Sequence, residues 1–417
     1  MKDAFLTLMG IIYYHIKYKY FPEKSKQFIS NYQYQKLKKL LIICNDVPYY
    51  KELFSKINFN PKIDFMSISD IEKIPILKKE IVRTNSEQFI NPRYIKKSLI
   101  FKTSGTTGTP FISYVSIKHW IVEQAVIWRH WKWAGYRLFD PIAIIRSHNP
   151  KSETDIIKED KIRRWTYYSP YHLNDTWMEV FYQDILKKKT KFLRGYPSSL
   201  SLFAEFCSRK GYSIPTLKAC LTASEVLTSK ERIIIEKTFN VKVFDHYGLA
   251  EAIVMLHNNG QKETYFNCDE YGFLELIKTD TEDQYKIIGT NLNNYSMPLI
   301  RYDTEDIAEA TKTENGFSIK NIIGRKDVYI QTESTLIPTV NLYTILYKVD
   351  GITQWQLIQN DKKTLDVYLK LKQEYDIDKV KNEIDKLNKT GLIFNYHETA
   401  IFLLVGEGKL KPFISNI

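Results

Sequence analysis

A loop rich in glycine, serine and threonine carries the strongest local chemical signal in this sequence. Residues 103–110, TSGTTGTP, follow an apolar segment, 98–102, that predicts a β-strand. Glycines let the backbone approach a bulky anion, and hydroxyl and amide groups donate hydrogen bonds to it. The loop has neither the lysine of a Walker A motif nor GxGxxG spacing. Taken alone, it is compatible with a plain turn or with a phosphate-binding loop.

Further polar motifs follow this loop in order. They are ASE at 223–225, DHYGLAE at 245–251, RYDTED at 301–306, GRKD at 324–327 and VGEGKLK at 405–411. Each residue also has an ordinary structural explanation: Tyr247 as a core residue, Glu251 as a surface carboxylate, and Asp306 as a helix cap or turn residue. The ordered series, rather than any single residue, therefore points to chemistry.

This ordered series resembles the adenylate-forming acyl and aryl ligases. The resemblance is strongest to the phenylacetate–CoA ligase-like branch, which includes the CapK proteins of capsule gene clusters. It covers most of the chain. It extends to VPYY at 47–50, IEKIPILKKEIVR at 71–83, AGY at 134–136, GYPSSL at 195–200 and MPLIRYD at 297–303.

The resemblance implies a site for ATP in which two groups of residues bind the phosphates and the base. The loop would hold the β- and γ-phosphates through Ser104, Gly105, Thr106, Thr107 and Gly108. The adenine would lie along the backbone of Ala223, Ser224 and Glu225, stack on Tyr247 and be accommodated by Gly248. A planar base favours a flat aromatic partner, which fits a tyrosine at this position.

The resemblance also implies the remaining contacts. Asp306 would accept hydrogen bonds from both ribose hydroxyls, and Arg325 would lie near the ribose and phosphate. Glu251 would bind Mg²⁺, and Lys409 would stabilise the adenylation transition state, with Lys411 as the alternative lysine. Attack of a carboxylate on the α-phosphate concentrates negative charge on phosphate oxygens, which a lysine, Mg²⁺ and amide groups stabilise.

The expected activity is an AMP-forming, ATP-dependent carboxylate ligase that makes an acyl-adenylate. The expected acceptor is an amine or hydroxyl of a sugar or amino acid in surface-polysaccharide synthesis, and CoA is the alternative. Three residues depart from the family pattern: Ala250 replaces Ser or Thr, Glu305 replaces Gly, and Thr109 stands where many relatives have Lys. Because of these departures, a further alternative is that the protein binds nucleotide but is not catalytic.

The elements that position these motifs predict an α/β fold. Helices are expected at 33–44 and 117–134, a turn at VPYY, 47–50, and a surface loop at 150–164. Helix and strand patterns alternate over 198–245, which predicts a parallel sheet. Short strands over 262–310 predict a β-rich subdomain. We expect an adenylate-forming domain at 1–325 and a small, mobile α+β lid at 326–417.

The charge is unevenly distributed. The formal net charge is +12 and aromatic residues make up 14%, which raises the question of nucleic acid. However, no nucleic-acid-binding signature is present, so we expect no such partner. Residues 1–60 hold ten lysines and four acidic residues, a local +6. This excess predicts a solvated basic face or contact with anionic lipid or an acidic glycan.

The expected location is the cytoplasm, with contact to the inner membrane face as an option. The N-terminal apolar stretch, 4–16, is interrupted by polar residues and has no cleavage site, so we expect no signal peptide. An apolar run long enough to span a membrane is also missing from the sequence. The four cysteines form no CxxC pair, which favours a reducing compartment.

Overall fold

The structure is a computed structural model. It describes residues 2–102, 112–146, 148, 155–170, 172–173, 175–261, 264–314, 316–325, 329–333, 336–338, 342, 346, 349–388, 391–399, 401–405, 409–410 and 413–417. The chain divides into two compact units. Unit 1 comprises 1–140, 218–226 and 242–324, and unit 2 comprises 141–217, 227–241 and 325–417. The lid expected at 326–417 stays a prediction.

Unit 1 is built around a mixed sheet whose strands run in the order β11-β12-β13-β14-β10-β9-β8-β7. Their bounds are β7 Ala219–Ala223, β8 Lys242–Gly248, β9 Met255–Asn258, β10 Tyr265–Asn267, β11 Gly272–Lys278, β12 Gln284–Asn291, β13 Tyr302–Thr313 and β14 Gly316–Arg325. Strands β7 and β8 are parallel, and β8 to β10 and β11 to β13 pair antiparallel. The expected parallel pairing and the β-rich segment are both observed.

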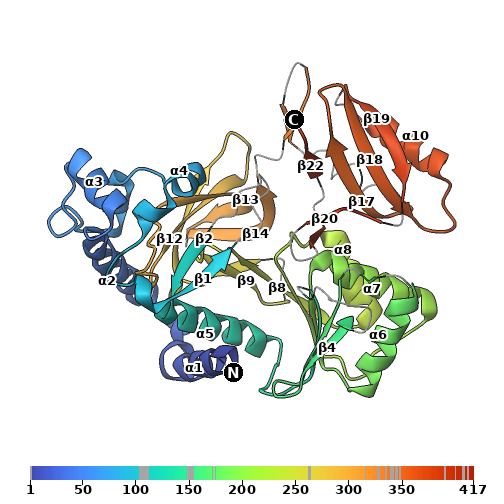
Figure 1. Ribbon diagram of the computed structural model, residues 1–417, viewed down its shortest axis with the longest axis horizontal. Coiled ribbons are helices and arrows are strands. Elements are labelled where there is room, and N and C mark those ends of the chain that lie inside the picture. The colour runs from blue at the N-terminus through green and yellow to red at the C-terminus, as the bar shows by residue number, and fades with distance from the viewer. Residues whose placement is uncertain are drawn as a thin grey trace. The chain divides into compact units, whose positions relative to one another are not determined.

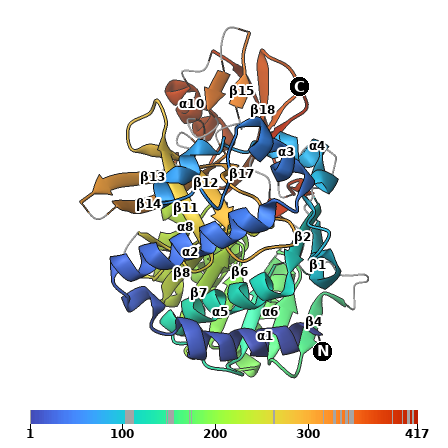
Figure 2. The same cartoon turned by 90° about the vertical axis from the view of Figure 1, so that its left-hand side faces the viewer.

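The helices of unit 1 lie mainly before this sheet in the sequence. They are α1 Lys2–Tyr13, α2 Lys26–Cys44, α3 Pro48–Lys56, α4 Lys79–Thr84 and α5 Ile117–Trp133. A hairpin of β1, Ser98–Lys102, and β2, Ile112–Ser116, precedes α5. Helices α1 and α5 lie side by side (Figures 1 and 2), and a Cβ on Gly10 would come within 2.4 Å of the Gln124 Cβ. Glycine at this position therefore permits the close helix packing.

Unit 2 contains a second set of strands, in the order β6-β3-β5-β4. They are β3 Ile142–Ile145, β4 Ile157–Asp160, β5 Trp165–Tyr168 and β6 Phe192–Gly195. Strand β3 is parallel to β5 and β6, and β4 is antiparallel to β5. Helices α6 Asp175–Lys187, α7 Pro197–Lys210 and α8 Ser229–Phe239 belong to the same unit.

The C-terminal part of unit 2 is a four-stranded sheet in the order β19-β18-β17-β22, with helix α10, Ile377–Leu387. The strands are β17 Ile352–Gln359, β18 Thr364–Leu371, β19 Ile393–Glu398 and β22 Phe413–Ser415. Val380 and Ile384 of α10 share a buried apolar cluster with Leu365 and Val367 of β18. Short hairpins are formed by β15 Tyr329–Gln331 with β16 Leu336–Pro338 and by β20 Leu404–Val405 with β21 Lys409–Leu410.

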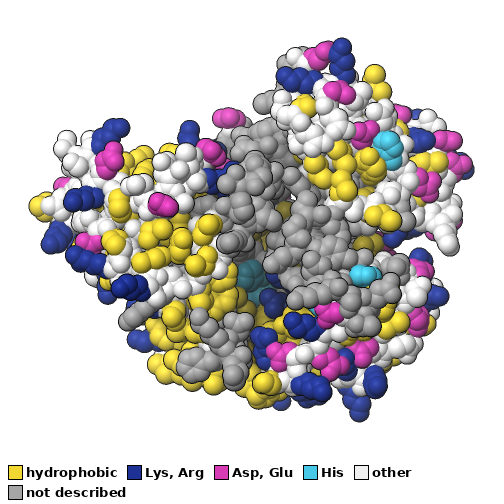
Figure 3. Space-filling view, in the orientation of Figure 1, with side chains coloured by type: hydrophobic (Ala, Val, Ile, Leu, Met, Phe, Trp, Pro, Cys, Tyr) yellow, Lys and Arg dark blue, Asp and Glu magenta, His cyan; other side chains and the backbone are white. Residues whose placement is uncertain are grey.

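Local sequence patterns predicted most element types, with two differences. The VPYY segment begins helix α3, because Val47 is its N-cap residue and Pro48 occupies the first helical position, where no amide donor is needed. The segment expected to be a loop at 150–164 contains β4. No helix among the described residues is both long and apolar enough to cross a membrane. On the face shown in Figure 3, lysine and arginine side chains are interspersed with acidic and apolar ones.

Candidate functional site

Two of the predicted nucleotide-binding side chains are joined directly in unit 1. The Tyr247 hydroxyl at the end of β8 donates a hydrogen bond of 2.7 Å to Oδ2 of Asp306 on β13. Both side chains are half-buried. Burial, followed by the neighbouring Asp306 charge, raises the pKa of Tyr247 well above its ordinary value, so the phenol stays protonated and remains a donor. The predicted adenine and ribose residues thus form one cluster.

The predicted adenine edge lies on the strand next to Tyr247. Ala223 ends β7 and is the register partner of His246 on the parallel strand β8. Ser224 then adopts a left-handed conformation with φ of 76°, which is uncommon for a non-glycine residue. Strand β7 ends directly before Ser224, which is exposed, and Glu225 is half-buried. The adenine-binding role of residues 223–225 stays a prediction.

The predicted metal ligand Glu251 is buried and has two partners. Its Oε1 atom accepts hydrogen bonds from Lys79 Nζ at 2.9 Å and from the Tyr302 hydroxyl at 3.1 Å. Burial acts to raise the pKa of Glu251, but the Lys79 charge and these hydrogen bonds outweigh it, and the net pKa is lowered. Glu251 is therefore an ionised carboxylate. Neither Lys79 nor Tyr302 is among the site residues predicted from the sequence.

Lys79 reaches Glu251 because two of the weaker sequence motifs pair with each other. The Leu77 amide donates to the Arg301 carbonyl, and the Asp303 amide donates to the Leu77 carbonyl, each at 2.9 Å. These bonds fix the start of α4 beside β13. The Tyr50 hydroxyl accepts a hydrogen bond of 2.9 Å from the Ile300 amide, which joins the VPYY motif to the same place. The motifs at 47–50, 71–83 and 297–303 are thus one packed region.

Glu251 fits Mg²⁺ as a ligand in its chemistry. Mg²⁺ prefers oxygen ligands and is usually bound by one or two carboxylates together with substrate phosphates. An ionised, buried carboxylate meets that requirement. Lys79 already neutralises this carboxylate, so a magnesium ion would share Glu251 with an ammonium group.

The departure at Glu305 has a visible backbone consequence. Glu305 has φ of 65°, the left-handed region in which glycine is at ease and other residues are strained. Its amide donates to Asp303 Oδ1 at 2.9 Å, and the next amide, of Asp306, donates to Thr304 Oγ1 at 3.1 Å. These bonds hold the turn that presents Asp306. The conformation explains why a glycine is suited to this position.

The other predicted residues lie outside the described residues, or are described in their backbone or exposure alone. Ser104, Gly105, Thr106, Thr107 and Gly108 lie outside the described residues, as do Thr109 and Lys411. Arg325 ends β14 and Lys409 begins β21, and only their backbone is described. Gly248 ends β8 and is exposed, as is Ala250. The phosphate, lysine and arginine assignments stay predictions.

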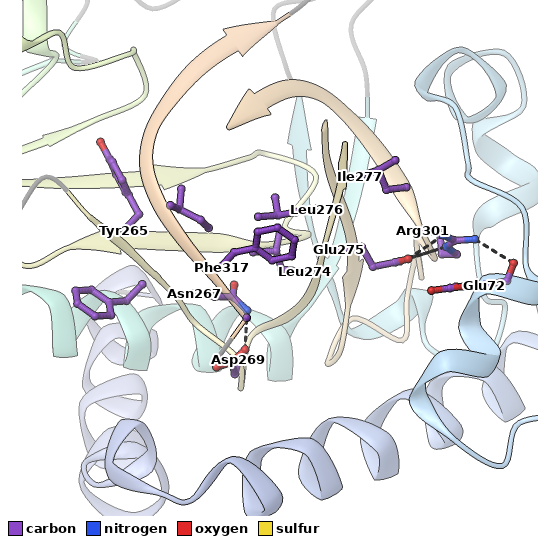
Figure 4. A pocket seen from close by; sticks show the side chains of 13 residues that line it. Glu72, Tyr265, Asn267, Asp269, Leu274, Glu275, Leu276, Ile277, Arg301 and Phe317 are labelled. Carbon is purple, nitrogen blue, oxygen red and sulfur yellow. Dashed lines mark hydrogen bonds and ion pairs between the residues drawn. The ribbon is translucent and has the colours of Figure 1, made fainter. Parts of the chain in front are cut away.

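A separate open pocket of about 850 Å³ lies in unit 1 (Figure 4). Tyr265, Asn267, Glu275, Arg301 and Phe317 are among its lining residues. The Arg301 guanidinium is held by the Glu275 carboxylate at 2.8 Å and by two backbone carbonyls, of Glu72 and Ile74. Among the described residues, the lining includes none of the predicted nucleotide contacts. Arg301 therefore serves to join elements of unit 1.

Comparisons with known proteins agree with the family resemblance. No family model matches the sequence. Protein CapK of Staphylococcus aureus is 26% identical, over 90% of this chain and 89% of CapK. A crystal structure of 2-hydroxyisobutyryl-CoA ligase in the postadenylation state has a TM-score of 0.69, with 14% identity over 92% of this chain and 89% of the ligase. ATP-bound MatB from Rhodopseudomonas palustris has a TM-score of 0.51, with 14% identity over 75% of this chain and 66% of MatB.

Proposed function

This chain has the fold of the adenylate-forming ligases and is similar to CapK along most of its length, and we propose that it is an AMP-forming, ATP-dependent carboxylate ligase. The hydrogen bond between Tyr247 and Asp306 carries the proposal. It joins an aromatic ring and a carboxylate from strands that lie far apart in the sequence. A flat ring suits a base, and a carboxylate beside it suits the two hydroxyls of a ribose.

In the proposed reaction, a carboxylate oxygen of the substrate attacks the α-phosphorus of ATP. The new bond joins that oxygen to phosphorus, the bond to the bridging oxygen breaks, and pyrophosphate leaves with its electron pair. Asp306 holds the ribose, and Tyr247 fixes the plane of the adenine. Glu251 would hold Mg²⁺, which when bound offsets negative charge on the phosphates. The predicted roles of the 104–108 loop and Lys409 complete the assignment.

Lys79 has a positioning role in this proposal. Its ammonium group and the Tyr302 hydroxyl fix Oε1 of Glu251 in the buried site. A carboxylate held by two partners loses little further side-chain freedom when a ligand arrives, which favours binding. Lys79 also keeps Glu251 ionised despite its burial, because an opposite charge at hydrogen-bond distance favours the charged form.

We propose an amine or hydroxyl group of a sugar or amino acid as the acceptor, in the synthesis of a surface polysaccharide. The similarity to CapK and the basic N-terminal segment support this acceptor. CoA is the alternative, since crystal structures of 2-hydroxyisobutyryl-CoA ligase contain CoA with an acyl-adenylate. Attack of the acceptor on the acyl carbon releases AMP in either case, and the acceptor's proton goes to solvent or to a base.

A contact with the membrane surface would place the enzyme near such an acceptor. Leu8, Ile12 and Ile16 follow one another at four-residue spacing, and 47%, 44% and 72% of their surfaces are exposed. Leu8 and Ile12 lie on one side of α1, and Ile16 lies in the π-helical turn, Tyr14–Tyr18, that follows it. Lys17 and Lys19 are exposed immediately beyond. An apolar stripe next to lysines suits the surface of an anionic bilayer, so we propose peripheral attachment to the cytoplasmic face.

Carboxylate-dependent exchange of labelled pyrophosphate into ATP tests the proposed activity. A panel of aliphatic, aromatic and hydroxy acids is assayed first without an acceptor. The active acids are then assayed with CoA, amino acids and amino sugars, with AMP release as the readout. Asp306→Asn should abolish most exchange, whereas Glu309→Gln, a carboxylate-to-amide change on the same strand, should not. ATP binding without exchange for any acid would favour the non-catalytic alternative.

A further inference from the structure

Three histidines that the proposed reaction does not use gather in unit 1. They are His130 on α5, His246 on β8 and His257 on β9, and one ring nitrogen from each lies within 4.8 Å of the others. His246 and His257 are register partners on antiparallel strands. The His130 ring stacks on the His257 ring, with centroids 4.3 Å apart and planes 18° apart. A helix and two strands thus bring three imidazoles to one point.

The hydrogen bond of His130 leaves its other nitrogen suited to a metal. His130 Nε2 lies 2.9 Å from the Asn258 carbonyl oxygen, which can only accept, so Nε2 carries the proton and donates. The lone pair then resides on Nδ1. Metal-binding histidines typically donate their second ring nitrogen to a carbonyl or carboxylate in this way, which fixes the orientation of the ring.

His257 supplies an independent observation. Its Nδ1 atom lies 3.4 Å from Cys268 Sγ. Its Nε2 atom is buried and has no hydrogen-bond partner among the described residues. A buried polar nitrogen without a partner loses its hydrogen bond to water and gains none in return, which is unfavourable unless a ligand satisfies it. A metal ion at the cluster would satisfy this nitrogen.

We propose that His130, His246 and His257 bind one divalent late transition-metal ion such as Zn²⁺. Imidazole nitrogens are suited to Zn²⁺, Cu²⁺ and Ni²⁺, whereas Mg²⁺ prefers oxygen ligands, so this site is distinct from Glu251. Metal–nitrogen distances of about 2.1 Å place two ligand nitrogens about 3.4 Å apart, so the cluster contracts on binding. The stacked His130 and His257 rings also turn out of parallel, because the lone pair of an imidazole lies in its ring plane. His246 is half-buried and the other two are buried, which makes His246 the ligand reached from solvent.

The local charge accommodates a cation. Arg129, which precedes His130 on α5, forms a buried ion pair with Glu270. Its positive charge is therefore already balanced next to the cluster. Gly248 adds room on the open side, because a Cβ at this position would lie 2.7 Å from Nε2 of His246. Because glycine has no Cβ, the His246 ring can lie close to the backbone of Gly248.

The metal would hold residues of the nucleotide site in position and would take no part in the reaction. His246 directly precedes Tyr247 on β8, and their side chains point to opposite faces of the strand. A metal that joins α5, β8 and β9 fixes the backbone that carries Tyr247. The site is therefore a structural clamp behind the predicted adenine platform.

Metal content tests this proposal without any assay of activity. The full-length chain, purified without a histidine tag, is incubated with excess Zn²⁺ and freed of loosely bound ion by gel filtration in metal-free buffer. Elemental analysis should find about one Zn²⁺ per chain, as three imidazoles and one open position form a complete site. Substitution with Co²⁺ should give the intense visible bands of a tetrahedral site.

Matched variants assign the ligands. His257→Ala and His130→Ala should each lose the bound metal, and His15→Ala, at an exposed histidine on the N-terminal helical segment, should retain it. Circular dichroism checks that the variants fold. If a ligand variant does not fold, a chromogenic chelator in competition with the wild-type chain gives the metal affinity instead. Wild-type protein without stoichiometric metal, or His257→Ala that binds as wild type does, would overturn the proposal.

Discussion

The Lys79 ammonium lies 2.9 Å from Oε1 of Glu251, and both side chains are buried. The two residues come from different sequence motifs and meet because the Leu77 backbone pairs with residues 301 and 303. A buried ion pair of this kind is specific in its geometry rather than strongly stabilising in net terms, because removing both charges from water opposes their attraction. The main effect of this ion pair is that it keeps the Glu251 carboxylate ionised and fixes its position.

Replacing Lys79 by methionine should destabilise the protein. The change keeps most of the side-chain volume but leaves the Glu251 charge buried and unpaired. Removing one partner of such a pair typically costs about 3–5 kcal/mol in the free energy of unfolding. Chemical denaturation monitored by circular dichroism measures the loss. The double variant Lys79→Met with Glu251→Gln should recover much of it, because no uncompensated charge remains.

Lys78→Met is the matched control for this experiment, since Lys78 is exposed and adjacent in sequence. It should change the free energy of unfolding by less than about 0.5 kcal/mol, as is usual for surface positions. Equal losses for Lys78→Met and Lys79→Met would contradict the assignment of Lys79 to the pair.

The stability of the protein should depend on the ionisation of Glu251. Because its pKa is lowered in the folded state, the carboxylate contributes stability above its unfolded-state pKa, near 4.5. That contribution is lost as the pH falls from there through the lower, folded-state pKa. Unfolding free energies of wild type and Glu251→Gln are compared at pH 6 and pH 3.5. The difference between the two proteins should shrink at the lower pH, and a constant difference would count against the prediction.

Nucleotide recognition by Asp306 can be isolated with a modified ligand. A carboxylate that binds both ribose hydroxyls should favour ATP over 2′-deoxy-ATP by about tenfold to a hundredfold, the range for hydrogen bonds to a charged group. Asp306→Asn should weaken ATP binding and reduce this discrimination. Isothermal titration calorimetry with both nucleotides gives the four affinities. Unchanged discrimination in Asp306→Asn would show that another residue contacts the ribose.

Tyr247→Phe separates the ring from its hydroxyl. The variant keeps the aromatic face but loses the hydrogen bond to Asp306, so the carboxylate is less well oriented. A hydrogen bond to a charged carboxylate contributes about 1.5–3 kcal/mol, so losing it should weaken ATP affinity by up to about tenfold to a hundredfold. Tyr247→Ala should lose the face as well and bind more weakly than Tyr247→Phe. Equal affinities for the two variants would argue against stacking on the ring.

Local periodicity explains why much of the fold was predictable. The helix expected at 117–134 is α5 at Ile117–Trp133, and the alternating helix and strand patterns expected over 198–245 are α7, β7, α8 and β8. The pairing of Tyr247 with Asp306 could be expected from the sequence, because both residues belong to the ordered series of motifs that resembles the adenylate-forming ligases. The partners of Glu251 could not be predicted from the sequence, because Lys79 is brought to Glu251 only by backbone pairing between distant segments. The histidine cluster likewise depends on how α5 crosses β8 and β9.

Replacing Glu305 by glycine should stabilise the turn before Asp306. The left-handed conformation at φ of 65° costs a non-glycine residue about 1–2 kcal/mol. Glycine's greater freedom in the unfolded chain offsets part of this gain, so the expected net increase is about 0.5–1 kcal/mol. Denaturant unfolding measures it. Glu309→Gly on the same strand, where φ is not positive, should instead destabilise, and a loss of stability in both variants would refute the strain argument.

The exposed stripe of Leu8, Ile12 and Ile16 should bind anionic vesicles. Wild-type protein should co-sediment with vesicles containing phosphatidylglycerol and much less with pure phosphatidylcholine, because lysines near the stripe add about 1 kcal/mol each at an anionic surface. Added salt should weaken the binding. Ile16→Asp should reduce it, because the change removes apolar contact and adds a negative charge.

Ile63→Asp is the matched control for the vesicle experiment, since Ile63 is an exposed isoleucine outside the stripe with 67% of its surface accessible. It makes the same change of charge and polarity and should leave vesicle binding intact. Equal losses for Ile16→Asp and Ile63→Asp would attribute the effect to net charge alone. Because the stripe and the nucleotide residues are separate, Ile16→Asp should also keep wild-type pyrophosphate exchange in solution, which distinguishes a defect in attachment from a defect in catalysis.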